Sequence, residues 1–129
     1  MAMRQQRTVL FVCPHGAGKS RIAAAWFTGL ALPGWTALSA GIQPQTEVSV
    51  HAARLLAGTP VRALLDESAP RPVSAVPAPQ LLVAIDCADG LTADVRWALV
   101  QQSFDEQMCA EIRDRVNALA ATLATSQPS

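Results

Sequence analysis

A cysteine, a short glycine-containing loop and a Lys-Ser pair follow one another near the start of the chain. An apolar, β-rich stretch ends at Cys13, two glycines follow, and Lys19 and Ser20 open an alanine-rich segment typical of a helix. A glycine-containing turn between strand and helix directs backbone N–H groups and the positive end of the helix dipole at one point, which favours phosphate-like anions. The same field favours the thiolate form of Cys13. The pattern predicts an oxyanion site with a nucleophile at its base.

Two other interpretations fit parts of this segment. Free cysteine is among the most buried residue types, so Cys13 alone is compatible with simple packing. The residues Gly18, Lys19 and Ser20 also complete a nucleotide-binding P-loop, and an apolar strand ending at Asp86 resembles the magnesium-binding strand of such proteins. However, the P-loop requires a glycine where this chain has Cys13. The oxyanion site is therefore the preferred interpretation.

The chemistry of the side chains assigns roles within the loop. Cys13 would attack phosphorus or bind arsenic, and Ser20 either donates its hydroxyl to the sulfur or serves as a helix cap. Lys19 supplies a positive charge, and His15 either tunes the sulfur or faces solvent. Backbone N–H groups would hold the oxygens of the anion. The predicted oxyanion-binding residues are Pro14, His15, Gly16, Ala17, Gly18, Lys19 and Ser20.

Composition limits the class of protein. The length of 129 residues predicts one domain, residues 1–129, with a single core. Ten basic and ten acidic side chains give a formal charge of zero, which argues against nucleic acid or an anionic membrane as partner. An odd number of cysteines, three, and no cationic and apolar leader predict a reducing cytoplasm. No cofactor and no metal site are expected.

Strands and helices alternate along the chain, which predicts a doubly wound parallel sheet with the site at the carboxyl ends of its strands. Four of the nine prolines lie between Ser68 and Pro79, so this stretch is expected to be an extended connection. Ser103 and Glu106 form a predicted capping box for the last helix. The expected strands are Thr8–Cys13, Trp35–Ser39, Leu81–Ile85 and Val95–Val100, and the expected helices are Lys19–Leu30, Glu47–Ala57 and Ser103–Leu123.

In the segment around Cys13 and in two later segments, the chain resembles the low-molecular-weight tyrosine phosphatase superfamily, which includes thioredoxin-coupled arsenate reductases. The family signature is an apolar strand, C-x5-R-S and an alanine-rich helix, and Val9–Phe27 is similar to it throughout. Leu38–Gly41 resembles the S-A-G that follows the second strand, and Trp97–Leu123 resembles the end of the domain. The resemblance implies a flavodoxin-like sheet of four or five mainly parallel strands, order 2-1-3-4, with helices on both faces. Cys13 and the supporting residues Ser39 and Asp86 would then share one edge.

The chain departs from the family pattern at three points. The family arginine is Lys19, which cannot grip two oxygens in one plane. The usual loop asparagine is Gly16, a residue that adopts a left-handed backbone freely and lacks the side-chain hydrogen bonds that asparagine offers, including one toward Ser39. The Asp-Pro pair that carries the general acid has no counterpart after Trp97. The carboxyl groups near predicted strand ends are either substitutes for it or turn residues: Asp86, Asp89 and Asp94.

These observations lead to a hypothesis with two alternatives. The leading function is hydrolysis of phosphate monoesters through a phosphocysteine on Cys13, with weakened activity. The second is arsenate reduction, for which Cys87 is the candidate resolving thiol, whereas Cys109 fits the packing of its helix. The third is a protein that binds phosphate or a phosphoprotein without turnover. The expected ligands are phosphate, arsenate or a similar oxyanion.

Overall fold

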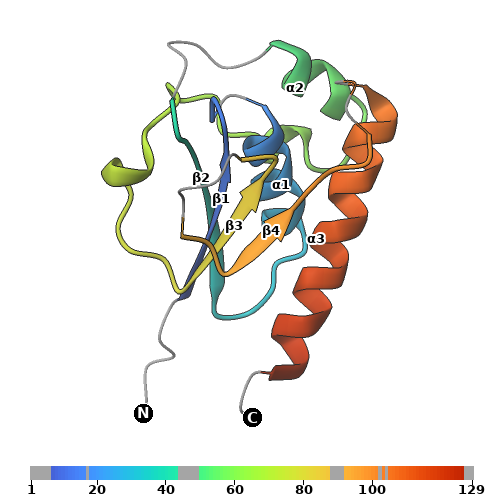
Figure 1. Ribbon diagram of the computed structural model, residues 1–129. Coiled ribbons are helices and arrows are strands. Elements are labelled where there is room, and N and C mark those ends of the chain that lie inside the picture. Colours follow the sequence, from blue (N-terminus) through green and yellow to red (C-terminus); the bar gives the residue numbers. More distant parts are fainter. Residues whose placement is uncertain are drawn as a thin grey trace.

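A parallel four-stranded sheet forms the centre of the protein (Figure 1). The computed structural model describes residues 7–16, 18–43, 50–87, 92–101, 103 and 105–126. All pairings are parallel and the order is β2-β1-β3-β4, which confirms the predicted flavodoxin-like topology. The carboxyl ends of the strands therefore meet at one edge of the sheet. The strands are β1 (Arg7–Cys13), β2 (Trp35–Gly41), β3 (Leu81–Ile85) and β4 (Val95–Trp97).

The apolar run that ends at Cys13 occupies the centre of this sheet. Val9–Val12 are fully buried because β1 pairs with β2 on one side and β3 on the other. The last strand is shorter than predicted. Beyond Trp97 the backbone N–H of Leu99 donates to a carboxylate oxygen of Asp86, and the next two donate to the carboxylate of Glu111. Side chains thus replace a strand partner there.

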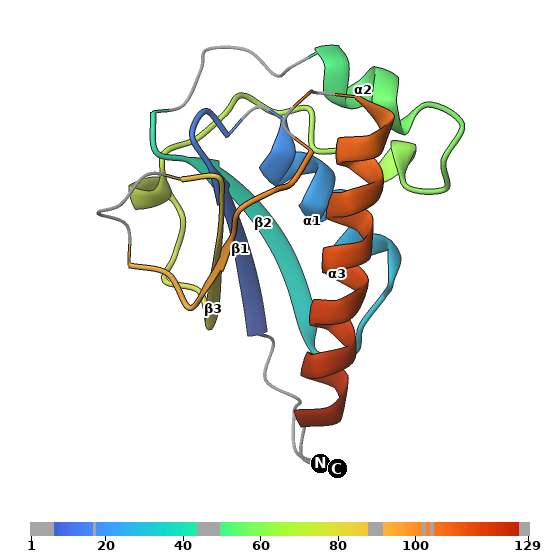
Figure 2. The same ribbon diagram turned by 45° about the vertical axis from the view of Figure 1, so that its right-hand side comes forward.

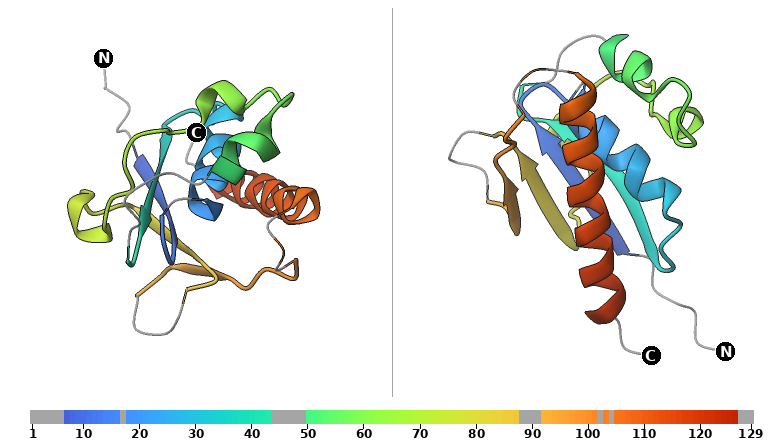
Figure 3. Two further views of the ribbon diagram at one scale, coloured as in Figure 1. Left: turned by 90° about the horizontal axis from the view of Figure 1, so that it is seen from above. Right: turned by 90° about the vertical axis from the view of Figure 1, so that its right-hand side faces the viewer.

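The three α-helices pack on one face of the sheet, as the view from above shows (Figure 3). They are α1 (Lys19–Gly29), α2 (Val50–Leu56) and α3 (Glu106–Ser126), and α3 runs beside α1 along the length of the sheet (Figure 2). The predicted capping box at Ser103 and Glu106 is wrong. Asp105 caps α3 instead, because its carboxylate accepts the N–H groups of Gln107 and Met108 at 3.1 Å.

The other face of the sheet is covered by the proline-rich connection. This connection, expected to be extended, carries one short 3-10 helix, η2 (Val73–Ala75), so among the described residues this face has a single helical turn where the resemblance implied a helix. The high density of prolines explains that difference, because proline removes the N–H groups that a longer helix needs. An earlier 3-10 helix, η1 (Arg62–Leu64), follows α2. The residues packed on this face are Leu10, Val12, Ala40, Val73, Val76, Leu82 and Cys87.

Candidate functional site

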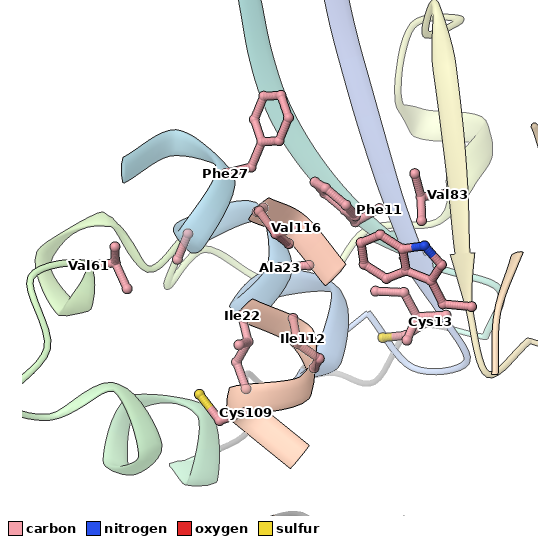
Figure 4. Packing of buried hydrophobic residues seen from close by; sticks show 14 of the residues in the cluster. Phe11, Cys13, Ile22, Ala23, Phe27, Val61, Val83, Cys109, Ile112 and Val116 are labelled. Atoms are coloured by element: carbon pink, nitrogen blue, oxygen red, sulfur yellow. The ribbon is translucent and has the colours of Figure 1, made fainter. Parts of the chain in front are cut away.

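Cys13 lies at the carboxyl end of β1 and is only 3% exposed. Its Sγ accepts a hydrogen bond from the backbone N–H of Gly16 at 3.2 Å and lies 3.2 Å from Ser20 Oγ. The loop therefore folds back over the sulfur, and the hydroxyl predicted to reach it does so. In Figure 4, Cys13 stands at the edge of the hydrophobic cluster beside Phe11 and Val83.

The first turn of α1 forms the far side of the loop. Gly18 is the N-cap residue, its carbonyl accepts the N–H of Ile22, and within the described part of the chain no side chain caps this end. An α-helix leaves its first N–H groups without internal partners, and these groups attract anions. The sequence thus places helix N–H groups that no described side chain caps close to the nucleophile.

Two glycines join the loop to the end of β2. Gly16 has a φ of +65°, and a Cβ there would lie 2.7 Å from the backbone nitrogen of Gly41. A Cβ on Gly41 would meet the nitrogen of Gly16 at 2.5 Å. This backbone therefore does not admit the asparagine found in the resembled family. Consistent with that loss, the buried hydroxyl of Ser39 has no hydrogen-bond partner among the described residues.

Lys19 is held by a carboxylate rather than left open toward the loop. Its Nζ lies 2.6 Å from Asp86 Oδ2, and the two side chains are 19% and 14% exposed. Asp86 follows β3 with a φ of +53°, and its other oxygen accepts the N–H of Leu99 at 2.8 Å. The structure thus pairs Asp86 with Lys19, a contact that was not predicted from the sequence, and both oxygens of that carboxylate accept hydrogen bonds.

Two of the remaining predicted loop residues, Pro14 and His15, interact with Gln43 in the segment after β2. Pro14 was predicted to bind the oxyanion, but proline has no N–H, and its carbonyl instead accepts the N–H of Gln43 at 2.9 Å. The exposed His15 ring has its Nδ1 3.4 Å from the carbonyl of Gln43, so it contacts the segment after β2 rather than the sulfur. Ala17 lies outside the described residues.

One buried cation beside the loop was missed in the sequence. Arg21 is 1% exposed, and its Nε donates to the carbonyl of Gly16 at 2.8 Å. Its terminal nitrogen donates to the carbonyl of Asp66 and lies 3.6 Å from the Asp66 carboxylate. Burial lowers the pKa of the Arg21 guanidinium, while the charge of Asp66 opposes that shift. The signal in the sequence was a single charge within the apolar run that follows Ser20.

The other two cysteines occupy different surroundings. Cys87 packs on the face of the sheet opposite the α-helices, and its Sγ lies 3.3 Å from the carbonyl of Val12. Burial, reinforced by the negative charge of Cys13, raises the pKa of the Cys87 thiol. Cys109 is buried near Ile22 and Ile112, away from Cys13 in Figure 4, as its helical spacing predicts. Burial raises the pKa of the Cys109 thiol as well.

The candidate substitutes for the general acid are not placed for that role. Asp94 exchanges hydrogen bonds with the backbone of Leu82, near the amino ends of β3 and β4, so it lies away from the carboxyl edge. Asp89 falls outside the described residues. Within the described ranges, no group of three His, Cys, Asp or Glu side chains is arranged to hold a metal ion, and none of the helices is long and apolar enough to cross a membrane.

Comparison with known proteins was made at three levels. No family model matches the sequence, and no curated protein matches it. Solved structures do match. A thioredoxin-dependent arsenate reductase of Corynebacterium glutamicum has a TM-score of 0.82 at 24% identity, over 98% of this chain and 66% of that one. An arsenate reductase from Archaeoglobus fulgidus has a TM-score of 0.70 at 29% identity, over 88% and 98% of the two chains.

A third neighbour is a phosphatase. The YwlE arginine phosphatase from Geobacillus stearothermophilus has a TM-score of 0.65 at 20% identity, over 94% of this chain and 95% of that one. The fold and the loop after β1 define a parallel α/β protein with a cysteine at the base of a loop that leads into a helix. In its fold the chain is similar to arsenate reductases and to an arginine phosphatase. It spans less than two thirds of the Corynebacterium chain.

Proposed function

We propose that this protein is a cysteine-based hydrolase that cleaves phosphate monoesters through a phosphocysteine on Cys13. The observation that carries the proposal is the position of the sulfur. Cys13 Sγ receives the N–H of Gly16 and lies 3.2 Å from Ser20 Oγ, beneath the uncapped first turn of α1. A nucleophile and a set of oxyanion donors therefore share one small volume, which is the arrangement that phosphoryl transfer requires.

The reaction follows from these positions. The thiolate of Cys13 attacks phosphorus, the bond to the leaving oxygen breaks with its electron pair, and a phosphocysteine forms. Water then attacks phosphorus, inorganic phosphate leaves, and the thiolate is regenerated. Loop N–H groups hold the oxygens in both steps, and Ser20 hydrogen-bonds the sulfur as it departs. Lys19 contributes one positive charge, which it shares with Asp86.

The arrangement around Asp86 restricts the substrate. This carboxylate accepts Lys19 Nζ with one oxygen and the N–H of Leu99 with the other, so neither oxygen is free to serve a leaving group. The segment that follows β4, where the resembled family carries its acid, reads Ala98 to Gln101 without a carboxylate. Leaving groups must therefore depart as anions, which favours aryl phosphates of acidic phenols.

Arsenate reduction is the second candidate. It is supported by the arsenate reductases among the structural neighbours and by the position of Cys87, whose Sγ is 3.3 Å from the carbonyl of the residue before Cys13. In that reaction two thiolate sulfurs become a disulfide while arsenic(V) becomes arsenic(III). Cys87 packs on the opposite face of the sheet from Cys13, so a disulfide between them requires backbone movement.

Steady-state turnover of para-nitrophenyl phosphate tests the leading proposal. Wild type and Cys109→Ser should turn over, whereas Cys13→Ser should not. The alternative is tested with arsenate and a thioredoxin system, where Cys87→Ser should abolish reduction. If neither reaction occurs but phosphate still protects Cys13 from iodoacetamide, the protein binds oxyanions without turnover, and the proposal is overturned.

A further inference from the structure

Arg21 is one of the largest fully buried side chains of the protein, at 1% exposure. A buried guanidinium is costly unless hydrogen bonds and an opposite charge satisfy it. Its Nε donates to the carbonyl of Gly16 at 2.8 Å, and a terminal nitrogen donates to the carbonyl of Asp66, whose carboxylate lies 3.6 Å away. The side chain therefore bridges the oxyanion loop and the segment that follows η1.

Gly16 connects this guanidinium to the nucleophile. The N–H of Gly16 donates to Cys13 Sγ at 3.2 Å, while its carbonyl accepts Arg21. One residue thus lies between the buried cation and the sulfur. Because Gly16 has a positive φ and packs against the backbone of Gly41, the loop has little freedom to rotate at this point.

Asp66 continues the network away from the loop. Its Oδ2 accepts Arg71 at 2.7 Å, and Arg71 also donates to the carbonyl of Ser39 at 3.1 Å. The carbonyl of Arg71 accepts the N–H of Gly41 at 2.9 Å, so the network returns to the glycine against which the loop packs. The loop is thus held from beneath through two separate connections.

The charges around Cys13 set the electrostatic role of this cation. The cations Lys19 and Arg21 come from α1, and His15 comes from the loop. Asp86 and Cys87 follow β3. Asp66 and Arg71 lie on the side of Arg21 away from the loop. Lys19 is neutralised by Asp86 at 2.6 Å. Asp66 is 38% exposed and shared between two arginines, so it compensates Arg21 less fully. Burial lowers the pKa of the Arg21 guanidinium, and the charges of Asp66 and Cys13 oppose that shift.

We propose that Arg21 is a positioning residue for Cys13: it holds the oxyanion loop over the sulfur through Gly16 and supplies the fixed positive charge that Lys19, paired with Asp86, does not. This inference rests on the proposed role of Cys13 as the reactive group. Arg21, on the buried side of the loop, then has an electrostatic role that Lys19 alone does not perform.

The test is the pH dependence of Cys13 alkylation by iodoacetamide, followed by mass spectrometry of the Cys13 peptide with and without phosphate. Arg21→Met should raise the pH midpoint by about one unit and weaken protection by phosphate. Arg21→Lys keeps the charge without the two-sided hydrogen bonding and should fall between Arg21→Met and wild type. Arg62→Met, which removes a surface cation paired with Glu67, is the matched control and should not differ from wild type.

Asp66→Asn provides a second variant in case Arg21→Met does not fold. Removing this carboxylate leaves the charge of Arg21 less compensated, so the midpoint should move to lower pH, opposite to the Arg21→Met shift. A shift in the same direction as Arg21→Met, or an unchanged midpoint in all variants, would overturn the inference. If wild-type Cys13 itself shows no phosphate protection, the failure belongs to the proposed function instead.

Discussion

Two ion pairs flank the same loop, and both take their cation from the first turn of α1. Lys19 reaches the carboxylate of Asp86 at 2.6 Å, with both side chains partly exposed at the carboxyl edge of the sheet. Arg21 lies beneath the loop, 1% exposed, and holds two backbone carbonyls in addition to the Asp66 carboxylate. The outer pair, Lys19 and Asp86, joins two side chains, whereas in the inner pair Arg21 mainly holds the backbone carbonyls of Gly16 and Asp66.

This difference separates the two tasks of an oxyanion loop. Holding the backbone donors in place depends on buried contacts, because desolvated hydrogen bonds leave unpaired groups when they are broken. Positive charge at the open side of the loop depends on the partly exposed Lys19–Asp86 pair. Solvent screens this pair, and a bound anion can compete with Asp86 for Lys19. Substitutions at the two pairs and at their partners test this division.

The first prediction concerns the consequence of occupying Asp86. Because this carboxylate is fully engaged with Lys19 and Leu99, no carboxyl group among the described residues is placed to protonate the leaving group, and phosphotyrosine should be cleaved about 10²–10⁴-fold more slowly than the phosphate of an acidic phenol. Rates across a graded series of phenols measure this dependence. A flat series in which release of the phenol limits the rate would show that an acid is present after all.

The second prediction compares the two cations by stability. Arg21→Met leaves the buried carbonyl of Gly16 unpaired and should lower the free energy of unfolding by about 3 kcal/mol. Lys19→Met breaks a partly exposed pair and should cost less than about 1 kcal/mol. Urea denaturation of both variants gives the two values. Equal losses would remove the distinction between the inner and outer pair.

The third prediction asks what Lys19 contributes to turnover. Lys19→Arg restores two-pronged recognition of phosphate oxygens and should raise kcat/KM for an aryl phosphate. The increase should be limited to about tenfold, because Asp86 still competes for the new guanidinium. Arg62→Lys is a matched control for a basic exchange away from the loop. A fall in kcat/KM with the fold intact would mean that the site is adapted to lysine and to a different ligand.

The fourth prediction concerns acid stability. Burial opposes ionisation of Asp66, but hydrogen bonds from Ser68 and Arg71 outweigh it and lower the pKa of this carboxyl from 3.8 to about 2. A folded-state pKa below the unfolded one contributes stability that is present above pH 4 and lost as the pH falls toward 2. Urea midpoints measured across this range should decline less in Asp66→Asn than in wild type. An identical decline in both proteins would show that Asp66 makes no such contribution.

The sequence was informative wherever local chemistry decides structure. The strand ending at Cys13, the loop glycines and the helix that follows are set by patterns within a few residues, and their topology and the contact between Cys13 and Ser20 appear as expected. The pairing of Lys19 with Asp86 was not predicted, because a spacing of 67 residues carries no local signal.

The features that were missed have different causes. A single charge within an apolar run did not by itself establish that Arg21 is buried, since its partners in the Asp66 segment follow 45 residues later. Ser103 matched the capping box in sequence, yet Asp105 caps α3 because the chain enters the helix two residues further on. Pro14 was counted among the loop donors by position, although its chemistry excludes that role.

The central claim, that Cys13 is a phosphoryl acceptor, is tested most directly by trapping the intermediate. Wild-type protein mixed with an aryl phosphate of an acidic phenol should be quenched in acid within milliseconds to seconds and the Cys13 peptide analysed by mass spectrometry. We predict a phosphocysteine on Cys13, absent in Cys13→Ser and unaffected in Cys109→Ser. Release of the phenol without any phosphocysteine at Cys13 would contradict the account.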